Sequence, residues 1–267
     1  MRVWVLGSGT LRPDPERGSP GYWIECGHER ILMDCGSGTV RTLARFGRAW
    51  QLVTRVLLSH FHTDHVADLA PLLFALKHGL DAPRSAPLTV LGPKGLLDHI
   101  DALSRAHGEF LRDPGFPVEF VELPPEDQWS TPGGACRIET FPTIHTAASL
   151  AYKLVTQAGV LGYTGDTGPD PSLGKFLSGC DVLIAECSLP DESGMSIHLT
   201  PTSLGEIAGV TGAGLLVTVH AYPPLDPEKV PDLLERSGYE GRVLVGKDGL
   251  TFTVSSGEVV VWDWRFP

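Results

Sequence analysis

Six consecutive residues, His60-Phe61-His62-Thr63-Asp64-His65, hold three imidazoles and one carboxylate. Neutral imidazole is the commonest metal ligand in proteins, and carboxylates complete sites for zinc and related ions. His60 and His62 are two positions apart, so on an extended backbone their side chains point to the same side and can share one ion. Asp64 and His65 follow after a turn and can hold a second ion. Because an H-x-H-x-D-H order is too particular for a chance cluster of histidines on a polar loop, it predicts a metal site.

Three further potential ligands, His145, Asp166 and His220, each follow an apolar segment that is typical of a β-strand. A single histidine in such a place is more often an ordinary polar side chain than a ligand. Together with the six-residue motif, which itself follows the apolar run 53–59, the three residues predict that several strand ends meet at one rim. The histidines without such a context are expected at the surface; they are His28, His78, His99 and His107.

With these motifs in order, the chain resembles the metallo-β-lactamase superfamily of hydrolases. The segment Met33–Gly38 is similar to an earlier acidic motif of that family, which usually braces the site. Within the superfamily the resemblance is closest to the ribonuclease Z-like phosphodiesterases. It rests on the aspartate at position 64, on the segment 163–167, and on Glu186 with the later segment 196–200.

This resemblance implies roles for the ligand-type residues. His60, His62 and His145 would hold one divalent ion, Asp64, His65 and His220 would hold the other, and Asp166 would bridge them. Two such ions can share a hydroxide and clamp the oxygens of a displaced phosphoryl group. Zn²⁺ is expected because nitrogen ligands dominate, and Mn²⁺ or iron is also compatible with a site that contains carboxylates.

The resemblance also implies how the reaction would be assisted. His198, oriented by Glu186, would protonate the leaving oxygen, a step typically worth about 10²–10⁴-fold in rate. Asp64 would orient the hydroxide in addition to its role as a ligand. The catalytic residues expected from the family are therefore Asp64, Glu186 and His198.

The order of segments agrees with the fold that the family implies. That fold is of the α+β class, a four-layer αβ/βα sandwich of the metallo-β-lactamase type, with two central mixed sheets covered by outer helices. Apolar and β-branched segments predict strands near residues 2–6, 21–26, 30–34, 53–59, 88–91, 118–123, 136–141, 149–155, 159–164, 181–186, 214–219, 242–245, 251–254 and 258–262. Helices are predicted near residues 39–47, 69–78, 94–107, 201–211 and 228–237.

Composition is consistent with one domain over residues 1–267. The chain is 42% hydrophobic and can bury a substantial core. No apolar run approaches about 20 residues, which argues against a membrane span, and the first residues read directly as a strand instead of a cleavable signal. Five cysteines without C-x-x-C spacing are typical of reduced thiols, so we expect a cytoplasmic protein.

The charge balance bears on the substrate. The net charge is −11, and the basic residues form no run beyond isolated pairs. Proteins that bind a polyanion usually have clusters of Lys and Arg on their surface. Transfer-RNA 3′-processing enzymes of the family carry a long basic arm between the ligands that match His145 and Asp166, whereas residues 146–165 of this chain leave room only for a short hairpin.

We therefore predict a phosphodiesterase that acts on a small or cyclic phosphodiester, and the charge argues against structured nucleic acid as a partner. Three alternatives stay open: a transfer-RNA 3′-processing endonuclease, a lactone or thioester hydrolase on the same metals, and a non-catalytic metal-bound scaffold or binding protein. The Glu186 and His198 pair disfavours the lactonase, because ester hydrolysis has less need of a separate acid. The complete ligand set disfavours the scaffold. A homodimer is compatible with the sequence.

Overall fold

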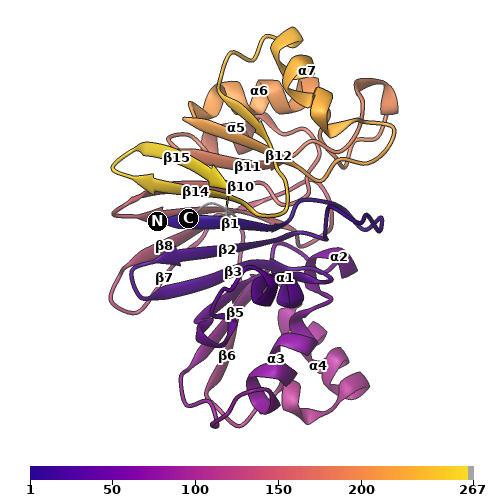
Figure 1. The fold of residues 1–267 in the computed structure, drawn as a ribbon. Coiled ribbons are helices and arrows are strands. Elements are labelled where there is room, and N and C mark those ends of the chain that lie inside the picture. The colour runs from indigo at the N-terminus through magenta and orange to yellow at the C-terminus, as the bar shows by residue number, and fades with distance from the viewer. Residues whose placement is uncertain (264–267) are drawn as a thin grey trace.

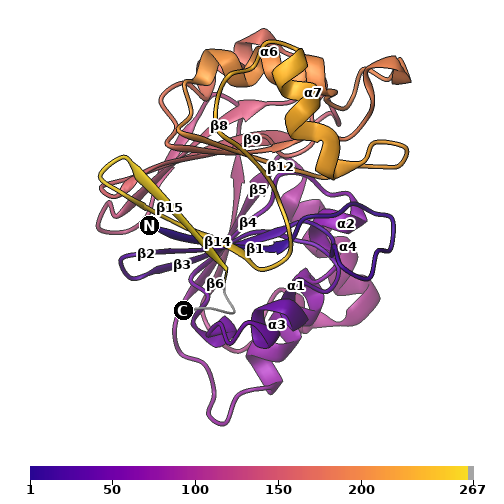
Figure 2. The ribbon, with the colours of Figure 1, turned by 45° about the horizontal axis from the view of Figure 1, so that its top comes forward.

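Two β-sheets lie face to face, and helices cover the outer face of each sheet (Figures 1 and 2). A computed structural model describes residues 1–263 of the chain. Figure 2 shows the four layers in sequence, from α6 and α7 at the top, through the two sheets, to α1 and α3 at the bottom. The predicted α+β sandwich with two mixed central sheets is confirmed.

The first sheet is built mainly from the N-terminal half of the chain. Its strands follow the spatial order β15 (Glu258–Asp263), β14 (Leu250–Ser255), β1 (Arg2–Gly7), β2 (Gly21–Cys26), β3 (Glu29–Cys35), β4 (Arg55–Leu57), β5 (Leu88–Pro93) and β6 (Val118–Leu123). Strands β3 to β6 run parallel to one another, and the remaining neighbours are antiparallel. Its outer helices are α1 (Thr39–Arg45), α2 (Thr63–Val66), α3 (Leu69–His78) and α4 (Leu96–His107).

The second sheet comes from the C-terminal half. Its strands follow the order β13 (Val243–Val245), β12 (Leu215–Val219), β11 (Val182–Glu186), β10 (Gly159–Tyr163), β9 (Leu150–Thr156), β8 (Cys136–Pro142) and β7 (Gln128–Ser130). Strands β10 to β13 are parallel. The helices on this side are α5 (Pro171–Phe176), α6 (Pro201–Thr211) and α7 (Val230–Arg236).

Strand β1 illustrates why the sheets are buried on both faces. Successive side chains of a strand point to opposite faces, and here both sets are apolar. Val3 and Val5 belong to the apolar cluster between the two sheets, whereas Trp4 and Leu6 belong to the cluster beneath the helices of the first sheet. A third apolar cluster lies between the second sheet and its helices. The three apolar layers hold the four-layer stack together.

The elements agree with the sequence predictions except where they are short. Strand β4 covers only Arg55–Leu57 of the predicted run 53–59, because its ladder with β3 has three residue pairs. Helix α2 and the three-residue strand β7 were not predicted, since neither is long enough for a periodic pattern. Helix α5 was also not predicted; Asp170 caps it by accepting a hydrogen bond from the Ser172 backbone N–H, and Pro171 follows the cap.

The strands that carry the predicted ligands end at a shared rim. In the first sheet β3 and β4 are parallel, so Asp34 near the end of β3 lies beside the loop that follows β4 and holds His60. In the second sheet β10, β11 and β12 are parallel, which brings Asp166, Glu186 and His220 to one edge. None of the helices within residues 1–263 combines the length and hydropathy that a membrane span requires.

Candidate metal centre

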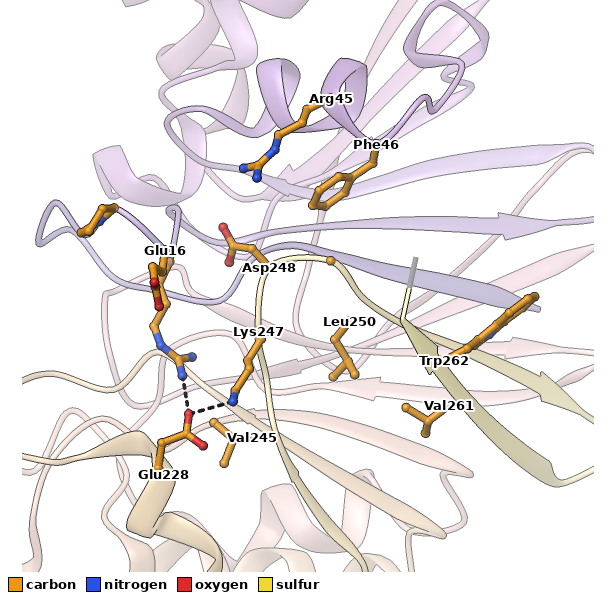
Figure 3. A pocket seen from close by; sticks show the side chains of 13 residues that line it. Glu16, Arg45, Phe46, Glu228, Val245, Lys247, Asp248, Leu250, Val261 and Trp262 are labelled. Carbon is orange, nitrogen blue, oxygen red and sulfur yellow. Dashed lines mark hydrogen bonds and ion pairs between the residues drawn. The ribbon is translucent and has the colours of Figure 1, made fainter. Parts of the chain in front are cut away.

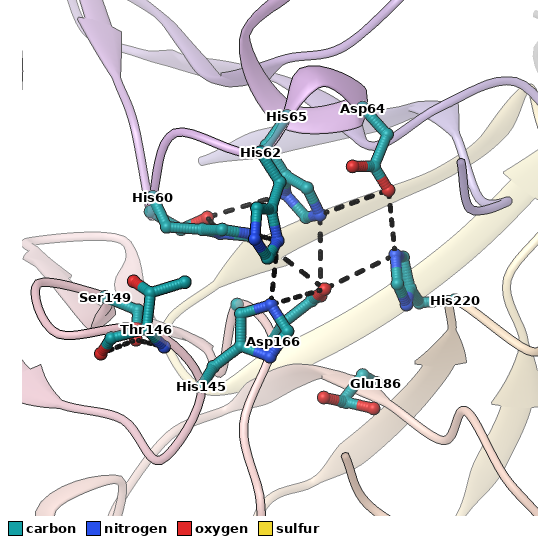
Figure 4. Close-up of polar contacts among 12 residues, drawn as sticks. His60, His62, Asp64, His65, His145, Thr146, Ser149, Asp166, Glu186 and His220 are labelled. Carbon is teal, nitrogen blue, oxygen red and sulfur yellow. Dashed lines mark hydrogen bonds and ion pairs between the residues drawn. The ribbon is translucent and has the colours of Figure 1, made fainter. Parts of the chain in front are cut away.

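Three histidines from both halves of the chain form the first ligand group (Figure 4). Nε2 of His60 lies 3.0 Å from Nδ1 of His62, and this Nδ1 lies 3.0 Å from Nε2 of His145. Two nitrogen ligands in a tetrahedral zinc site are about 3.3 Å apart, since each lies about 2.0–2.1 Å from the ion. The spacing of the three nitrogen atoms therefore suits a single ion of this kind.

The second group consists of Asp64, His65 and His220, whose donor atoms lie within 4.8 Å of one another. Oδ2 of Asp64 is 3.4 Å from Nε2 of His220 and 3.8 Å from Nε2 of His65. Nε2 of His65 is buried and has no hydrogen-bond partner. Buried polar atoms are nearly always paired, so an unpartnered ring nitrogen among other ligand-type atoms fits a metal ion.

Asp166 lies between the two groups. Its Oδ1 is 3.5 Å from Nε2 of His65, and its Oδ2 is 3.6 Å from both Nε2 of His145 and Nε2 of His220. Oδ2 is also 4.0 Å from Nε2 of His60. Burial alone would raise the pKa of Asp166, but the neighbouring His220 and His65 hold that pKa well below its usual range. An ionised carboxylate thus stands where a bridging ligand would be needed.

In His145 and His60, the ring nitrogen that points away from the centre has its own hydrogen-bond partner, so the opposite nitrogen is available to a metal ion. His145 donates from Nδ1 to the Ile197 carbonyl, and Nδ1 of His60 contacts the Ser59 hydroxyl. Burial, with the nearby His65 as a second cause, lowers the pKa of His60, and burial also lowers that of His145. The lowered pKa values favour the neutral imidazole, which is the form that binds metals.

His220 is fixed by its backbone as well as by its ring. Its φ of 62° places it in the left-handed region that non-glycine residues rarely adopt. The Ser188 hydroxyl donates to the His220 carbonyl and lies 3.1 Å from Nδ1, and the His220 N–H donates to the Ser8 carbonyl. These contacts hold the ring with Nε2 toward Asp64 and Asp166.

Glu186 and His198 form a pair beside the two ligand groups. Nδ1 of His198 lies 3.0 and 3.1 Å from the two oxygens of Glu186, the last residue of β11. Burial disfavours the imidazolium, but the hydrogen bond and charge of Glu186 raise the pKa of His198. The ring centroid of His198 is 4.9 Å from that of His145, so this pair borders the centre.

Thr200 fixes the chain just after His198. It caps helix α6: its hydroxyl accepts from the Ser203 backbone N–H, and the Ser203 hydroxyl accepts from the Thr200 N–H. This reciprocal pair is a capping box, which satisfies two backbone donors at the start of the helix. The segment that presents His198 is thereby anchored on both sides, by Glu186 and by α6.

The structure brings all nine predicted site residues together, and it adds several that the sequence did not reveal. Ser59 and Tyr163 both donate to Oδ2 of Asp34, and Ser188 orients His220. Ser59 could have been found from the sequence, since it directly precedes His60, the first ligand-type residue. Tyr163 begins the segment 163–167 that carries the family resemblance, but nothing in the sequence indicated its contact with Asp34. Ser188 has no signal, because serines on loops are common.

His99 was expected at the surface, but it is half-buried and stacks on Phe61, with ring centroids 4.9 Å apart. Phe61 lies between the ligand-type residues His60 and His62, so this stack attaches their loop to α4. Cys35 and Cys187, which adjoin Asp34 and Glu186, are both buried among apolar side chains.

A cavity of about 700 Å³ lies away from this centre, beside β14 and β15 (Figure 3). Its lining combines apolar side chains such as Phe46 and Trp262 with charged ones such as Arg45 and Lys247. None of the ligand-type residues of the metal centre lines it. The ligand-type residues are therefore gathered at the rim and not in this cavity.

Comparison with known proteins places these features in context. The model of a family described as "Beta-lactamase superfamily domain" matches residues 29–221. A protein named ribonuclease Z from Mycobacterium marinum is 28% identical and covers 93% of this chain and 96% of its own length. A protein of the same name from Mycobacterium bovis is 27% identical with the same coverage.

Solved structures agree in fold over almost the whole chain. The metallo-β-lactamase fold protein YhfI from Bacillus subtilis has a TM-score of 0.82 and 25% identity, covering 94% of this chain and 98% of that one. The short form of human tRNase Z has a TM-score of 0.77 and 23% identity, covering 95% of this chain and 99% of that one.

Proposed function

Since this chain belongs to the β-lactamase superfamily, we propose that it is a hydrolase that uses two divalent metal ions to cleave phosphodiesters. The observation that carries the proposal is the convergence of seven ligand-type side chains in two groups, with Asp166 between the groups and the Glu186–His198 pair beside them. The resemblance to the ribonuclease Z-like branch, made on the motifs, is matched by the relatives that carry that name.

The donor set supports two ions. His60, His62 and His145 would hold one, Asp64, His65 and His220 the other, and Asp166 would bridge. When bound, the ions would supply Lewis acidity and lower the pKa of water toward neutrality. The preponderance of imidazole nitrogen favours Zn²⁺, with Mn²⁺ or iron as the alternatives.

The protein's own side chains would then orient the attacking water and protonate the leaving oxygen. Asp64 would orient the attacking water, because its carboxylate lies at the edge of the second ligand group. His198 would protonate the leaving oxygen from Nε2, while Glu186 accepts from Nδ1 and fixes the tautomer. The raised pKa of His198 suits a group that must carry a proton before it donates one.

The substrate that we propose first is a small or cyclic phosphodiester. The segment between His145 and Asp166 forms only the β9–β10 hairpin, in which Thr156 pairs with Gly159, and it leaves no room for an arm.

RNA is the second candidate substrate. The prediction that structured nucleic acid would not be a partner conflicts with the relatives named ribonuclease Z, which match 93% of this chain at 27–28% identity, and we withdraw it. The charge of the whole chain was a poor guide, because two bound cations would make the site itself locally positive.

A single set of assays separates these possibilities. Metal-loaded protein is tested with bis-(p-nitrophenyl) phosphate, cyclic nucleotides, a lactone and a thioester, and a labelled transfer-RNA precursor is titrated at moderate salt. Turnover of the diesters with only weak, non-specific precursor binding would support the small phosphodiester as the substrate. Binding tighter than about a micromolar with accurate 3′ cleavage would establish the ribonuclease instead. Turnover of the lactone or thioester alone would refute the phosphodiesterase, and no turnover at all would favour a metal-bound scaffold.

A further inference from the structure

Tyr222 borders the proposed reaction site and has no role in the chemistry described above. It lies two residues after His220, and its backbone N–H donates to the Ser188 carbonyl. Its ring stands edge-on to His220, at 5.3 Å between centroids and an interplanar angle of 88°, and it lies 5.8 Å from the ring of His198. The ring therefore contacts one proposed ligand and the proposed proton donor.

The phenol of Tyr222 is held in place. Its hydroxyl is hydrogen-bonded to the side chain of Thr10, which is buried. The side chain is nevertheless only half-buried. A rigid ring with part of its surface open is suited to packing against a bound molecule.

Apolar side chains next to His198 and His145 in the chain are exposed. Ile197, 38% exposed, directly precedes His198, and its carbonyl accepts from His145. Met195 is 51% exposed in the same segment, and Ile144, next to His145, is 45% exposed. Exposed apolar side chains scattered singly need no explanation, but a group around a polar centre marks a binding surface.

We propose that Tyr222 and Ile197 flank the leaving group and favour phosphodiesters whose leaving group carries an aromatic ring. The inference rests on the proposed function, since His198 defines the leaving-group side: the oxygen that it protonates must lie next to its ring, and Tyr222 and Ile197 are its neighbours. A flat aromatic group can pack on the tyrosine ring and against the isoleucine, whereas a small alkyl group fills little of this surface.

The test uses methyl p-nitrophenyl phosphate, in which the only ring is on the leaving group, and dimethyl phosphate, which has none. In metal-loaded Tyr222→Leu we expect KM for the aryl diester to rise about three- to tenfold, as the loss of one aromatic pair implies. The inhibition constant of dimethyl phosphate should stay unchanged. Tyr222→Phe keeps the ring and should retain the wild-type KM, and metal content is measured in each variant.

A second variant tests whether the effect of Tyr222→Leu comes only from a general disturbance of His220. Ile197→Ser removes apolar surface on the same side and should raise KM for the aryl diester in the same direction, by a smaller factor. Leu52→Ser, at a side chain 56% exposed elsewhere, is the matched control and should change nothing. Equal changes for the aryl diester and dimethyl phosphate, or an unchanged KM in Tyr222→Leu, would overturn the inference alone. A wild-type protein that cleaves no diester would overturn the proposed function, and this inference with it.

Discussion

Oδ2 of Asp34 lies 2.7 Å from Nδ1 of His65, and both side chains are fully buried. The same oxygen accepts from the hydroxyls of Ser59 and Tyr163, and Oδ1 accepts from the Ser59 backbone N–H. Since Oδ2 can only accept, His65 must carry its proton on Nδ1, which leaves Nε2 available to a metal ion. Asp34 thus sets the tautomer of a proposed ligand although it is not itself one of the proposed ligands.

Asp34→Asn should therefore weaken metal binding by about 10- to 100-fold. If the amide nitrogen takes the place of Oδ2, a donor faces Nδ1 of His65, and the proton moves to the nitrogen that should bind the ion. Titration of the metal-free protein with Zn²⁺ against a competing chelator measures the change. Tyr163→Phe, which removes one donor to the same oxygen, is the control and should cost less affinity. An unchanged affinity in Asp34→Asn would show that Asp34 does not set the tautomer.

Asp166→Ala should lower the metal content of the purified protein. It removes the carboxylate that lies within 4.0 Å of ligand-type nitrogens in both groups, so neither ion keeps its full set of ligands. Plasma emission on wild type should give up to two ions per chain. Asp170→Ala, which changes the partly exposed cap of α5, is the comparison. Wild-type metal content in the Asp166 variant would exclude the bridging role.

His198→Ala should keep both metals and the fold while it slows phosphodiester cleavage. The loss should reach about 10²–10⁴-fold for an alkoxide leaving group and be much smaller for p-nitrophenolate, which hardly needs a proton. Glu186→Gln should give the same selective pattern to a lesser degree, because it weakens the orientation of His198. The rates for the two leaving groups provide the measurement. Equal losses for both, or loss of metal, would assign His198 to a structural or ligand role.

The cysteines should differ sharply in reactivity. Burial raises the pKa of the Cys136 and Cys180 thiols to about 12 and also raises the pKa of Cys35 and Cys187. Cys26 alone among the five is partly exposed. Since the thiolate is the reactive form, native protein at pH 8 should show one fast thiol with Ellman's reagent and five in guanidinium. Cys26→Ser should abolish the fast reaction; a second fast thiol would contradict the packing of the others.

The order and type of the ligand residues were determined by the sequence alone. The His60–His65 motif and the strand ends before His145, Asp166 and His220 could be read directly, because apolar strands leave a local period-two signal and metal ligands are few in kind. The sandwich of two sheets follows from the same local patterns. The four-residue helix α2, which carries Asp64 and His65, left no such signal because it is shorter than two turns.

Only the tertiary structure decided how these side chains face one another. The position of Asp166 between the groups, the contacts of Asp34 with His65, and the packing of Tyr222 on His220 and His198 join residues from different strands and loops. Such contacts depend on how two sheets stack and on which strands lie parallel. Those are long-range relationships, and no short segment of sequence encodes them.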